Sequence, residues 1–162
     1  MSIEKVKAYF AQYGMLERVL EFPISSATVE LAAVAVGCEP ARIAKTLSFS
    51  ANGSPILIVT AGDAKIDNAK YKAYFHVKAK MLTPDEAVTC IGHAVGGVCP
   101  FAINDGVAVY LDESMKRFKT VFPACGSSNS AIELTIEELE KHSTAKNWVD
   151  VCKAWQTLPD IN

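Results

Sequence analysis

The spacing of hydrophobic residues changes along the chain, and each change predicts a helix or a strand. Val6, Phe10 and Tyr13 recur at the spacing of one helix face, and Gly14 follows them as a residue suited to end a helix. Short apolar runs elsewhere lack helical spacing and are too short for a helix, which is typical of buried strands. The pattern therefore predicts interspersed helices and strands.

Helices are predicted where a side chain that can cap a first turn precedes a periodic segment. Thr83 with Glu86, and Thr135 with Glu138, have the spacing of a capping box. Gly37 is placed to end another helix. The predicted helices cover residues 3–13, 28–36, 67–76, 83–91 and 135–142, and a single helical turn begins at Pro40 and leads to Lys45.

Apolar runs bounded by turn residues predict strands at 18–22, 46–50, 55–60, 107–111, 120–124 and 131–134. Asn52-Gly53 between two of these runs predicts a tight hairpin. Residues 148–155 are predicted to form a strand or a short helix that packs the two tryptophans. The mixture predicts the α+β class: one domain over residues 1–162, with a mixed, mostly antiparallel sheet and surrounding helices.

The composition is that of an ordinary globular domain. Of 162 residues, 50% are hydrophobic and 21% are charged, which suffices for one sizeable core. No apolar run approaches the roughly 20 residues of a membrane-spanning helix. The first residues also lack the apolar core of a signal peptide. We therefore expect a cytoplasmic protein without a membrane partner.

The charge distribution bears on nucleic-acid binding. A net charge of −2 argues against a protein that coats long nucleic acid, so DNA is not an expected partner. It leaves open a protein that grips only the end of an RNA. A local basic stretch contains Lys65, Lys70, Lys72, Lys78 and Lys80. This stretch could contact RNA phosphates or could simply be a solvated helix face.

Five cysteines, an odd number, favour free thiols in a reducing compartment over a disulfide framework. Cys90, His93 and Cys99 lie close in sequence, but they lack the spacing of paired zinc ligands and a fourth ligand. We therefore expect no metal and no other cofactor. Cys99 or Cys125 could instead pair with His93, which would make the protein a cysteine hydrolase.

Residues 92–101 contain three glycines and end in Pro100-Phe101. Glycine leaves neighbouring N–H groups unobstructed, and successive free N–H groups can bind an anion or an oxyanion. Lys45, at the predicted junction of a helical turn and a strand, could add a positive charge, and residues 125–130 offer hydroxyls and an amide. The plainer alternatives are ordinary turns and a lysine that reaches water from a strand edge.

Three pieces of sequence follow one another in a specific order. They are Ile43-Ala44-Lys45-Thr46-Leu47, then Gly96-Gly97-Val98-Cys99-Pro100-Phe101, and then Gly126-Ser127-Ser128. With these pieces in this order, the chain resembles the YbaK / prolyl-tRNA-synthetase-associated editing-domain family from about Thr28 to Leu139. The resemblance implies a partly barrel-like sheet with surrounding helices.

The resemblance also implies a reaction, which is hydrolysis of the ester bond of wrongly charged aminoacyl-tRNA. The implied substrate is chiefly tRNA for proline that carries a small amino acid such as Cys or Ala. Lys45 matches the essential lysine of the family, and Gly96, Gly97 and Val98 are implied to lie at the reacting ester. Implied substrate-binding residues are Thr28, Pro100, Gly126, Ser127 and Ser128.

The implied partners are the acceptor end of tRNA and prolyl-tRNA synthetase. Some family members have a histidine in the segment that matches Ser127 to Ala131, and its absence here weakens an assignment to the alanine-specific branch. No general base is evident in the sequence. A non-catalytic module that binds tRNA or a synthetase therefore stays open as an alternative.

Overall fold

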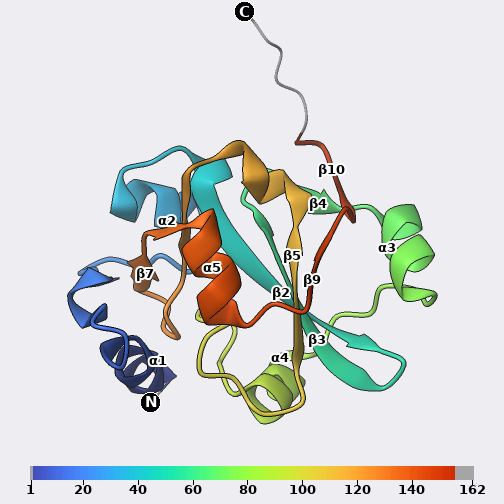
Figure 1. Cartoon of the computed structure of the whole chain (residues 1–162), viewed down its shortest axis with the longest axis horizontal. Coiled ribbons are helices and arrows are strands. Elements are labelled where there is room, and N and C mark those ends of the chain that lie inside the picture. Colours follow the sequence, from blue (N-terminus) through green and yellow to red (C-terminus); the bar gives the residue numbers. More distant parts are fainter. Residues whose placement is uncertain (1, 156–162) are drawn as a thin grey trace, which may run out of the picture.

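The computed structural model describes residues 2–155, in which helices and strands are interspersed (Figure 1). The helices are α1 (Ser2–Ala11), α2 (Val29–Val36), α3 (Asn68–Phe75), α4 (Pro84–Glu86) and α5 (Ile136–Ser143). Short 3-10 turns cover Leu16–Arg18, Pro40–Arg42 and Glu113–Arg117, and a π-helical turn at Ala87–Ile91 follows α4. None of the described helices is long and apolar enough to cross a membrane.

The strands are β1 (Val19–Glu21), β2 (Ile43–Ala51), β3 (Ser54–Ala61), β4 (Lys65–Ile66), β5 (Ala108–Asp112), β6 (Thr120–Pro123), β7 (Ser130–Ile132), β8 (Leu134–Thr135), β9 (Asn147–Val149) and β10 (Cys152–Lys153). Six of them form a sheet in the order β8-β6-β2-β3-β5-β9, and β1-β7 and β4-β10 form two small ribbons. In Figure 1, α5 lies in front of the sheet, and α1 and α3 lie at opposite ends of the molecule.

The predicted α+β class and the mixed sheet are confirmed. Strand β2 pairs antiparallel with β3 and parallel with β6, and β5 runs parallel to both β3 and β9. Among the described strands, antiparallel pairings outnumber parallel ones by four to three. The parallel pairings lie in the six-stranded sheet, because β5, β6 and β9 return to it over long connections.

The hairpin of β2 and β3 forms the centre of the fold. Asn52 and Gly53 have φ angles of 53° and 81°, the positive values that a tight two-residue hairpin turn requires. Residues 56–61 of β3 are all buried, since the sheet is covered on both faces. This hairpin therefore gives β2 a fixed position, and Lys45 lies on it.

Helix α1 packs behind the glycine-rich segment. It buries Val6 and Phe10, and the Phe10 ring lies edge-on to the Phe101 ring with centroids 4.8 Å apart. The Ser2 hydroxyl donates to the Gly92 carbonyl oxygen at 3.1 Å. Contacts at both ends of residues 92–101 thus hold this segment against the core.

Four predicted elements differ in the structure. The strand predicted at 131–134 is divided into β7, which pairs with β1, and β8, which pairs with β6. The helix predicted to run from Thr83 into the glycine-rich segment is only α4 and a π-helical turn, which ends at Gly92 with φ 102°. Lys45 is not at a helix–strand junction, because β2 already begins at Ile43. Residues 148–155 contribute to two short strands, β9 and β10, and β10 pairs with the unpredicted β4.

Candidate functional site

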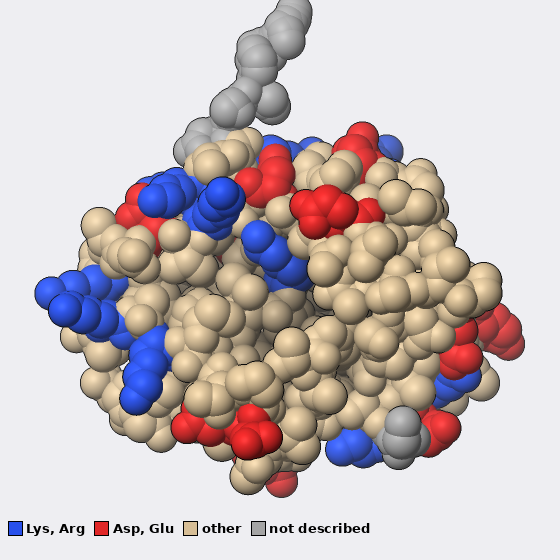
Figure 2. Space-filling model, turned by 180° about the vertical axis from the view of Figure 1, so that it is seen from behind, with Lys and Arg blue, Asp and Glu red and all other residues tan. Residues whose placement is uncertain are grey.

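A cavity of about 310 Å³ opens where α2, β2 and the glycine-rich segment meet. Its walls are residues 26–29 and Ala32, residues 43–48 of β2, Met81 and Leu82, residues 95, 96 and 98, and residues 122, 124, 130 and 131. Figure 2 shows a hollow on the face opposite α5, surrounded mainly by uncharged residues. Most of these side chains are small or aliphatic, so the cavity suits a small group of limited polarity.

Lys45 supplies a positive charge to this cavity. Its side chain is half-buried, and burial lowers the pKa of the ammonium group below its usual value. Within residues 2–155 no carboxylate lies at ion-pair distance from Lys45. The nearby Asp63 accepts two hydrogen bonds from Arg117 instead, at 2.6 and 3.0 Å. A desolvated ammonium without a fixed counterion is suited to hold an anionic or polar ligand.

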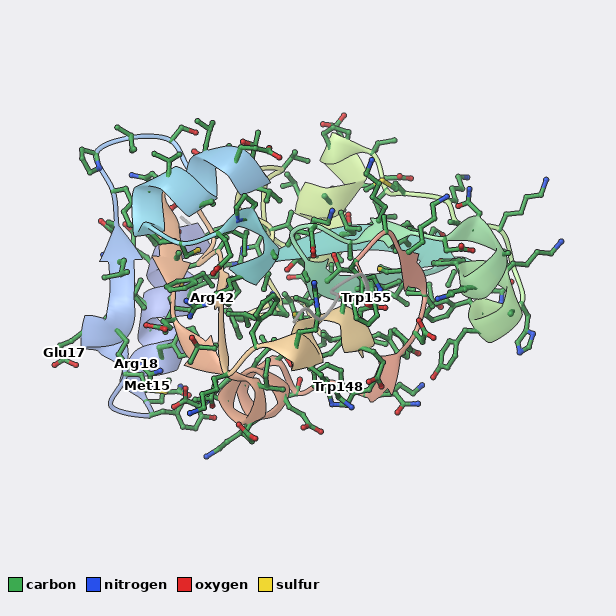
Figure 3. All side chains as sticks on the ribbon, turned by 90° about the horizontal axis from the view of Figure 1, so that it is seen from above. Met15, Glu17, Arg18, Arg42, Trp148 and Trp155 are labelled. Atoms are coloured by element: carbon green, nitrogen blue, oxygen red, sulfur yellow. The ribbon has the colours of Figure 1, made fainter. Side chains whose placement is uncertain are left out.

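A second cation beside the cavity wall, Arg42, is engaged in contacts within the fold. Arg42, labelled in Figure 3, lies over the ring of Phe122 with 5.2 Å from its guanidinium carbon to the ring centroid. Its guanidinium donates to Thr120 and to the Glu133 carboxylate. Phe122 lines the cavity, so Arg42 supports that wall from outside and is not available to a ligand.

The two glycines of the glycine-rich turn have different roles. The Gly97 N–H donates to the Ala94 carbonyl oxygen at 3.0 Å, and Gly96 has a φ of 96°, as the third residue of a type II turn requires. A Cβ on Gly97 would lie 2.6 Å from the Ser127 nitrogen. Gly97 therefore permits close approach to the protein's own backbone, whereas the sequence suggested approach to a substrate.

The N–H groups that flank Gly97 remain free. Within the described residues, neither the Gly96 nor the Val98 N–H has a hydrogen-bond partner. Both residues line the cavity. Free backbone donors in a turn of fixed geometry are the groups that stabilise a developing oxyanion.

The segment 126–130 forms a neighbouring wall and is fixed by its own network. The Ser26 N–H donates to the Ser128 carbonyl oxygen at 2.6 Å, and the Asn129 amide donates to the Phe22 carbonyl oxygen at 2.9 Å. The Ser127 hydroxyl lies 2.9 Å from the Asn129 side-chain oxygen, to which it donates. The polar groups of this segment are therefore largely used within the fold.

The structure brings some predicted site residues together and places others behind the cavity. Lys45, Gly96, Val98 and Thr28 line it. Gly97, Pro100 and Gly126 are buried and do not line it, Ser127 is half-buried, and Ser128 is exposed outside it. Thr28 also caps α2, since its hydroxyl accepts a hydrogen bond from the Leu31 N–H at 3.2 Å.

Sequence reasoning missed several cavity residues. Met81 and Leu82 belong to an extended segment that pairs with β2, and no periodicity marks it. Thr46 has a buried hydroxyl without a partner in the described part of the chain. Its only sequence signal was its position next to the predicted site residue Lys45.

The proposed cysteine chemistry is contradicted by burial. Cys99 and His93 do approach each other, with Sγ 3.6 Å from Nε2, but both side chains are completely buried. The Nε2 atom is also 2.8 Å from the Phe101 carbonyl oxygen, to which it donates. Burial raises the pKa of Cys99 to about 12 and that of Cys125 well above its usual value, so neither thiol is an accessible thiolate.

The metal interpretation of Cys90, His93 and Cys99 finds no geometric support. Across residues 2–155, no three His, Cys, Asp or Glu side chains are grouped so that they could hold a metal ion. His93 and Cys99 instead form a contact inside the core. The polar groups with which the cavity can act on a ligand are thus Lys45, the free N–H groups of the turn, and the hydroxyls of Ser26 and Thr46, which are unpartnered within the described residues.

The sequence profile of the aminoacyl-tRNA editing domain family matches residues 25–142, and the protein belongs to this family. Every residue that lines the cavity lies within the matched span. The chain is 55% identical over 157 residues to the "Uncharacterized protein YwhH" of Bacillus subtilis (strain 168), covering 96% of this chain and 100% of that protein.

Two further matches are to a proline–tRNA ligase and to a solved structure described in relation to prolyl-tRNA synthetase. It is 23% identical over 111 residues to the proline–tRNA ligase of Lactiplantibacillus plantarum, covering 68% of this chain but only 19% of the ligase. A solved structure described as "a putative trans-editing enzyme for prolyl tRNA synthetase" is 29% identical, with a TM-score of 0.84 over 94% of this chain and 97% of that one. The fold is therefore that of the editing family.

Proposed function

We propose that the protein hydrolyses, in trans, the ester bond of mischarged aminoacyl-tRNA, with tRNA for proline carrying a small amino acid such as Cys or Ala as the substrate. The observation that carries this proposal is the pairing of an uncommitted Lys45 with two free N–H groups in one small cavity. Family membership and the similarity to proline–tRNA ligases support the substrate class.

The chemistry needs little beyond these groups. Water adds to the ester carbonyl carbon and gives up a proton, and the carbonyl oxygen gains negative charge. The bond to the ribose oxygen then breaks, and that oxygen takes up a proton, so that the free amino acid and a tRNA with an intact terminal ribose hydroxyl are released. The Gly96 and Val98 N–H groups stabilise that negative charge, and a donor of this kind contributes about 3 kcal/mol to lowering a barrier. Lys45 holds the carbonyl, the ribose or the terminal phosphate in place.

The substrate's own ribose hydroxyl, next to the ester, assists in positioning the water. This accounts for a cavity in which His93 is turned into the core and, among residues 2–155, no carboxylate lines the wall. The apolar walls, among them Ala32, Ile43 and Ala131, favour an apolar or weakly polar side chain.

The acceptor end approaches from the side of α3. Figure 2 shows Lys and Arg side chains gathered at that side of the hollowed face. Lys72 in α3, and Lys78 and Lys80 in the segment that follows α3, are exposed. Lys70 is not part of this set, because its ammonium is bound to Asp150 at 3.1 Å and to the Cys152 carbonyl oxygen at 3.0 Å.

The test is a deacylation assay with the full chain and a panel of tRNAs, each charged with a wrong amino acid. Rapid hydrolysis of one or a few members, with correctly charged prolyl-tRNA spared, is the expected result. Binding of the same tRNAs without hydrolysis would replace this proposal with the non-catalytic module that binds tRNA or prolyl-tRNA synthetase. A cytoplasmic location follows from the proposed role in translation.

A further inference from the structure

Two large apolar side chains stand exposed at the mouth of the cavity. Met81 is 55% exposed and Val95 is 65% exposed, although both line the cavity. A single exposed aliphatic residue is common on a protein surface. Here, however, two such residues from separate segments lie at the opening of the same cavity.

Both side chains are held by fixed backbone. Residues 80–82 run along β2 as an added strand, since the Ser50 N–H donates to the Lys80 carbonyl oxygen at 2.9 Å and the Leu82 N–H donates to the Ser48 carbonyl oxygen at 3.0 Å. Val95 is the second residue of the turn that the Gly97–Ala94 hydrogen bond closes. Turn positions usually carry polar residues or proline, so the turn itself does not favour valine at position 95.

Positive charge flanks this apolar mouth. Lys78 and Lys80 are exposed in the segment that carries Met81, and Lys45 lies inside the cavity. A nucleotide presents the same arrangement of groups, since it has a flat base with apolar faces and a phosphate with negative charge. Pockets for single-stranded nucleic acid combine lysines for the backbone with apolar or aromatic surfaces for the bases.

We propose that Met81 and Val95 form a clamp for the purine base of the tRNA's terminal nucleotide. This inference rests on the proposed function, because the acyl group in the cavity would place its ribose and base at the mouth. The Met81 thioether adapts to the face of the ring, and Val95 covers the ring from the turn. Lys78 and Lys80 then lie near the phosphates that precede the terminal nucleotide.

The experiment compares two mischarged RNA microhelices, one with a terminal adenosine and one whose terminal ribose lacks its base. For the wild-type chain, loss of the base is expected to raise KM roughly 5- to 100-fold, the range that stacking of one base contributes. In the Met81→Ala/Val95→Ala double variant, the KM values for the two substrates are expected to be nearly equal. The rate at saturating substrate is expected to change by no more than about two-fold, because the clamp binds the base and not the ester.

The matched control is Val34→Ala, which removes an aliphatic side chain that is 72% exposed on α2 and does not line the cavity. It is expected to leave both KM values unchanged. Equal KM penalties for base removal in the wild type and the double variant would overturn the clamp while leaving the deacylase intact.

A second readout does not depend on turnover. The same two microhelices, carrying the amino acid through a non-hydrolysable amide bond, can be measured by equilibrium binding. The clamp predicts tighter binding of the adenosine form only when Met81 and Val95 are present. If no mischarged tRNA is hydrolysed, the proposed function fails, and this binding comparison still decides whether the base is held.

Discussion

Lys45 is the residue on which the proposed reaction depends most. Its ammonium is half-buried, its pKa is lowered by burial, and it has no ion-pair partner within the described residues. We expect Lys45→Ala to lower the single-turnover deacylation rate by at least ~100-fold, comparable to the loss of one oxyanion-stabilising group. Its melting temperature is expected to be unchanged or higher, because the variant removes a desolvated charge.

Lys141→Ala serves as the control for this experiment, since Lys141 is exposed on α5 and does not line the cavity. Its rate and melting temperature are expected to match the wild type. If Lys45→Ala remained folded and hydrolysed mischarged tRNA at the wild-type rate, Lys45 would have no role in the reaction.

His93 makes the stability of the glycine-rich segment sensitive to acid. Burial lowers the pKa of His93 below its usual value, and the hydrogen bond to Phe101 opposes this only in part. As the pH falls through about 6.5, His93 is therefore protonated in the unfolded chain before it is protonated in the folded one. The free energy of unfolding decreases from that pH downward. Above that pH the histidine is neutral in both states and contributes no pH dependence.

Melting temperatures of the wild type and His93→Gln between pH 7.5 and 5.5 measure this effect. The glutamine amide can still donate to the Phe101 carbonyl oxygen, but it does not titrate in this range. We expect the wild type to lose up to about 1.4 kcal/mol per pH unit more than the variant. Parallel pH profiles would show that His93 does not cause the acid sensitivity, and His142, whose pKa is also lowered by burial, would then be the remaining candidate.

At the scale of elements, the glycine-rich turn and the segment 126–130 form one unit. A Cβ on Gly97 would lie 2.6 Å from the Ser127 nitrogen and 2.7 Å from the Gly126 carbonyl carbon, so Gly97→Ala must push the two backbones apart. We expect a loss of about 1–3 kcal/mol in the free energy of unfolding, as overpacking usually causes. Chemical denaturation of the variant beside the wild type measures it, and equal midpoints would contradict the close packing.

The elements that follow from local physics were predictable. Both capping boxes are present, the Asn52-Gly53 hairpin has the expected turn, and α2 ends at Gly37 with φ 78°. In each case a few neighbouring residues determine the backbone conformation. The mixed sheet could also be predicted, because a chain with both hairpins and interspersed helices has few other ways to arrange its strands in a sheet.

The cavity walls were harder to predict, because they depend on contacts between distant segments. Met81 lies there through backbone hydrogen bonds between residues 80–82 and β2, and nothing in the sequence around Met81 indicates that pairing. Burial of His93 and Cys99 likewise follows from the packing of α1 against Phe101. Sequence placed Lys45, Gly96, Val98 and Thr28 as a set only through resemblance to a family.

At the scale of the whole molecule, the cavity and the exposed lysines near it lie on different parts of the fold. The β2–β3 hairpin and α1 hold the cavity walls from the core, while the exposed lysines lie on α3 and on the segment between α3 and Met81. Of these two parts, the cavity is the one that can enclose an acyl group and select it. The lysines can therefore contribute affinity for RNA without contributing to the choice of amino acid.

This separation predicts different effects on binding and on chemistry. Replacing Lys72, Lys78 and Lys80 together with alanine should weaken binding of tRNA and reduce the dependence of log K on log salt concentration by about 0.7–0.9 for each phosphate that the variant no longer neutralises. The single-turnover rate at saturating tRNA should stay near the wild-type value, because Lys45 and the turn are intact. The control is Lys141→Ala in α5, the helix that lies in front of the sheet in Figure 1, on the face opposite the hollow of Figure 2. An unchanged affinity and salt dependence in the triple variant would show that these lysines are only a solvated surface, and the acceptor end would then have to approach from another side.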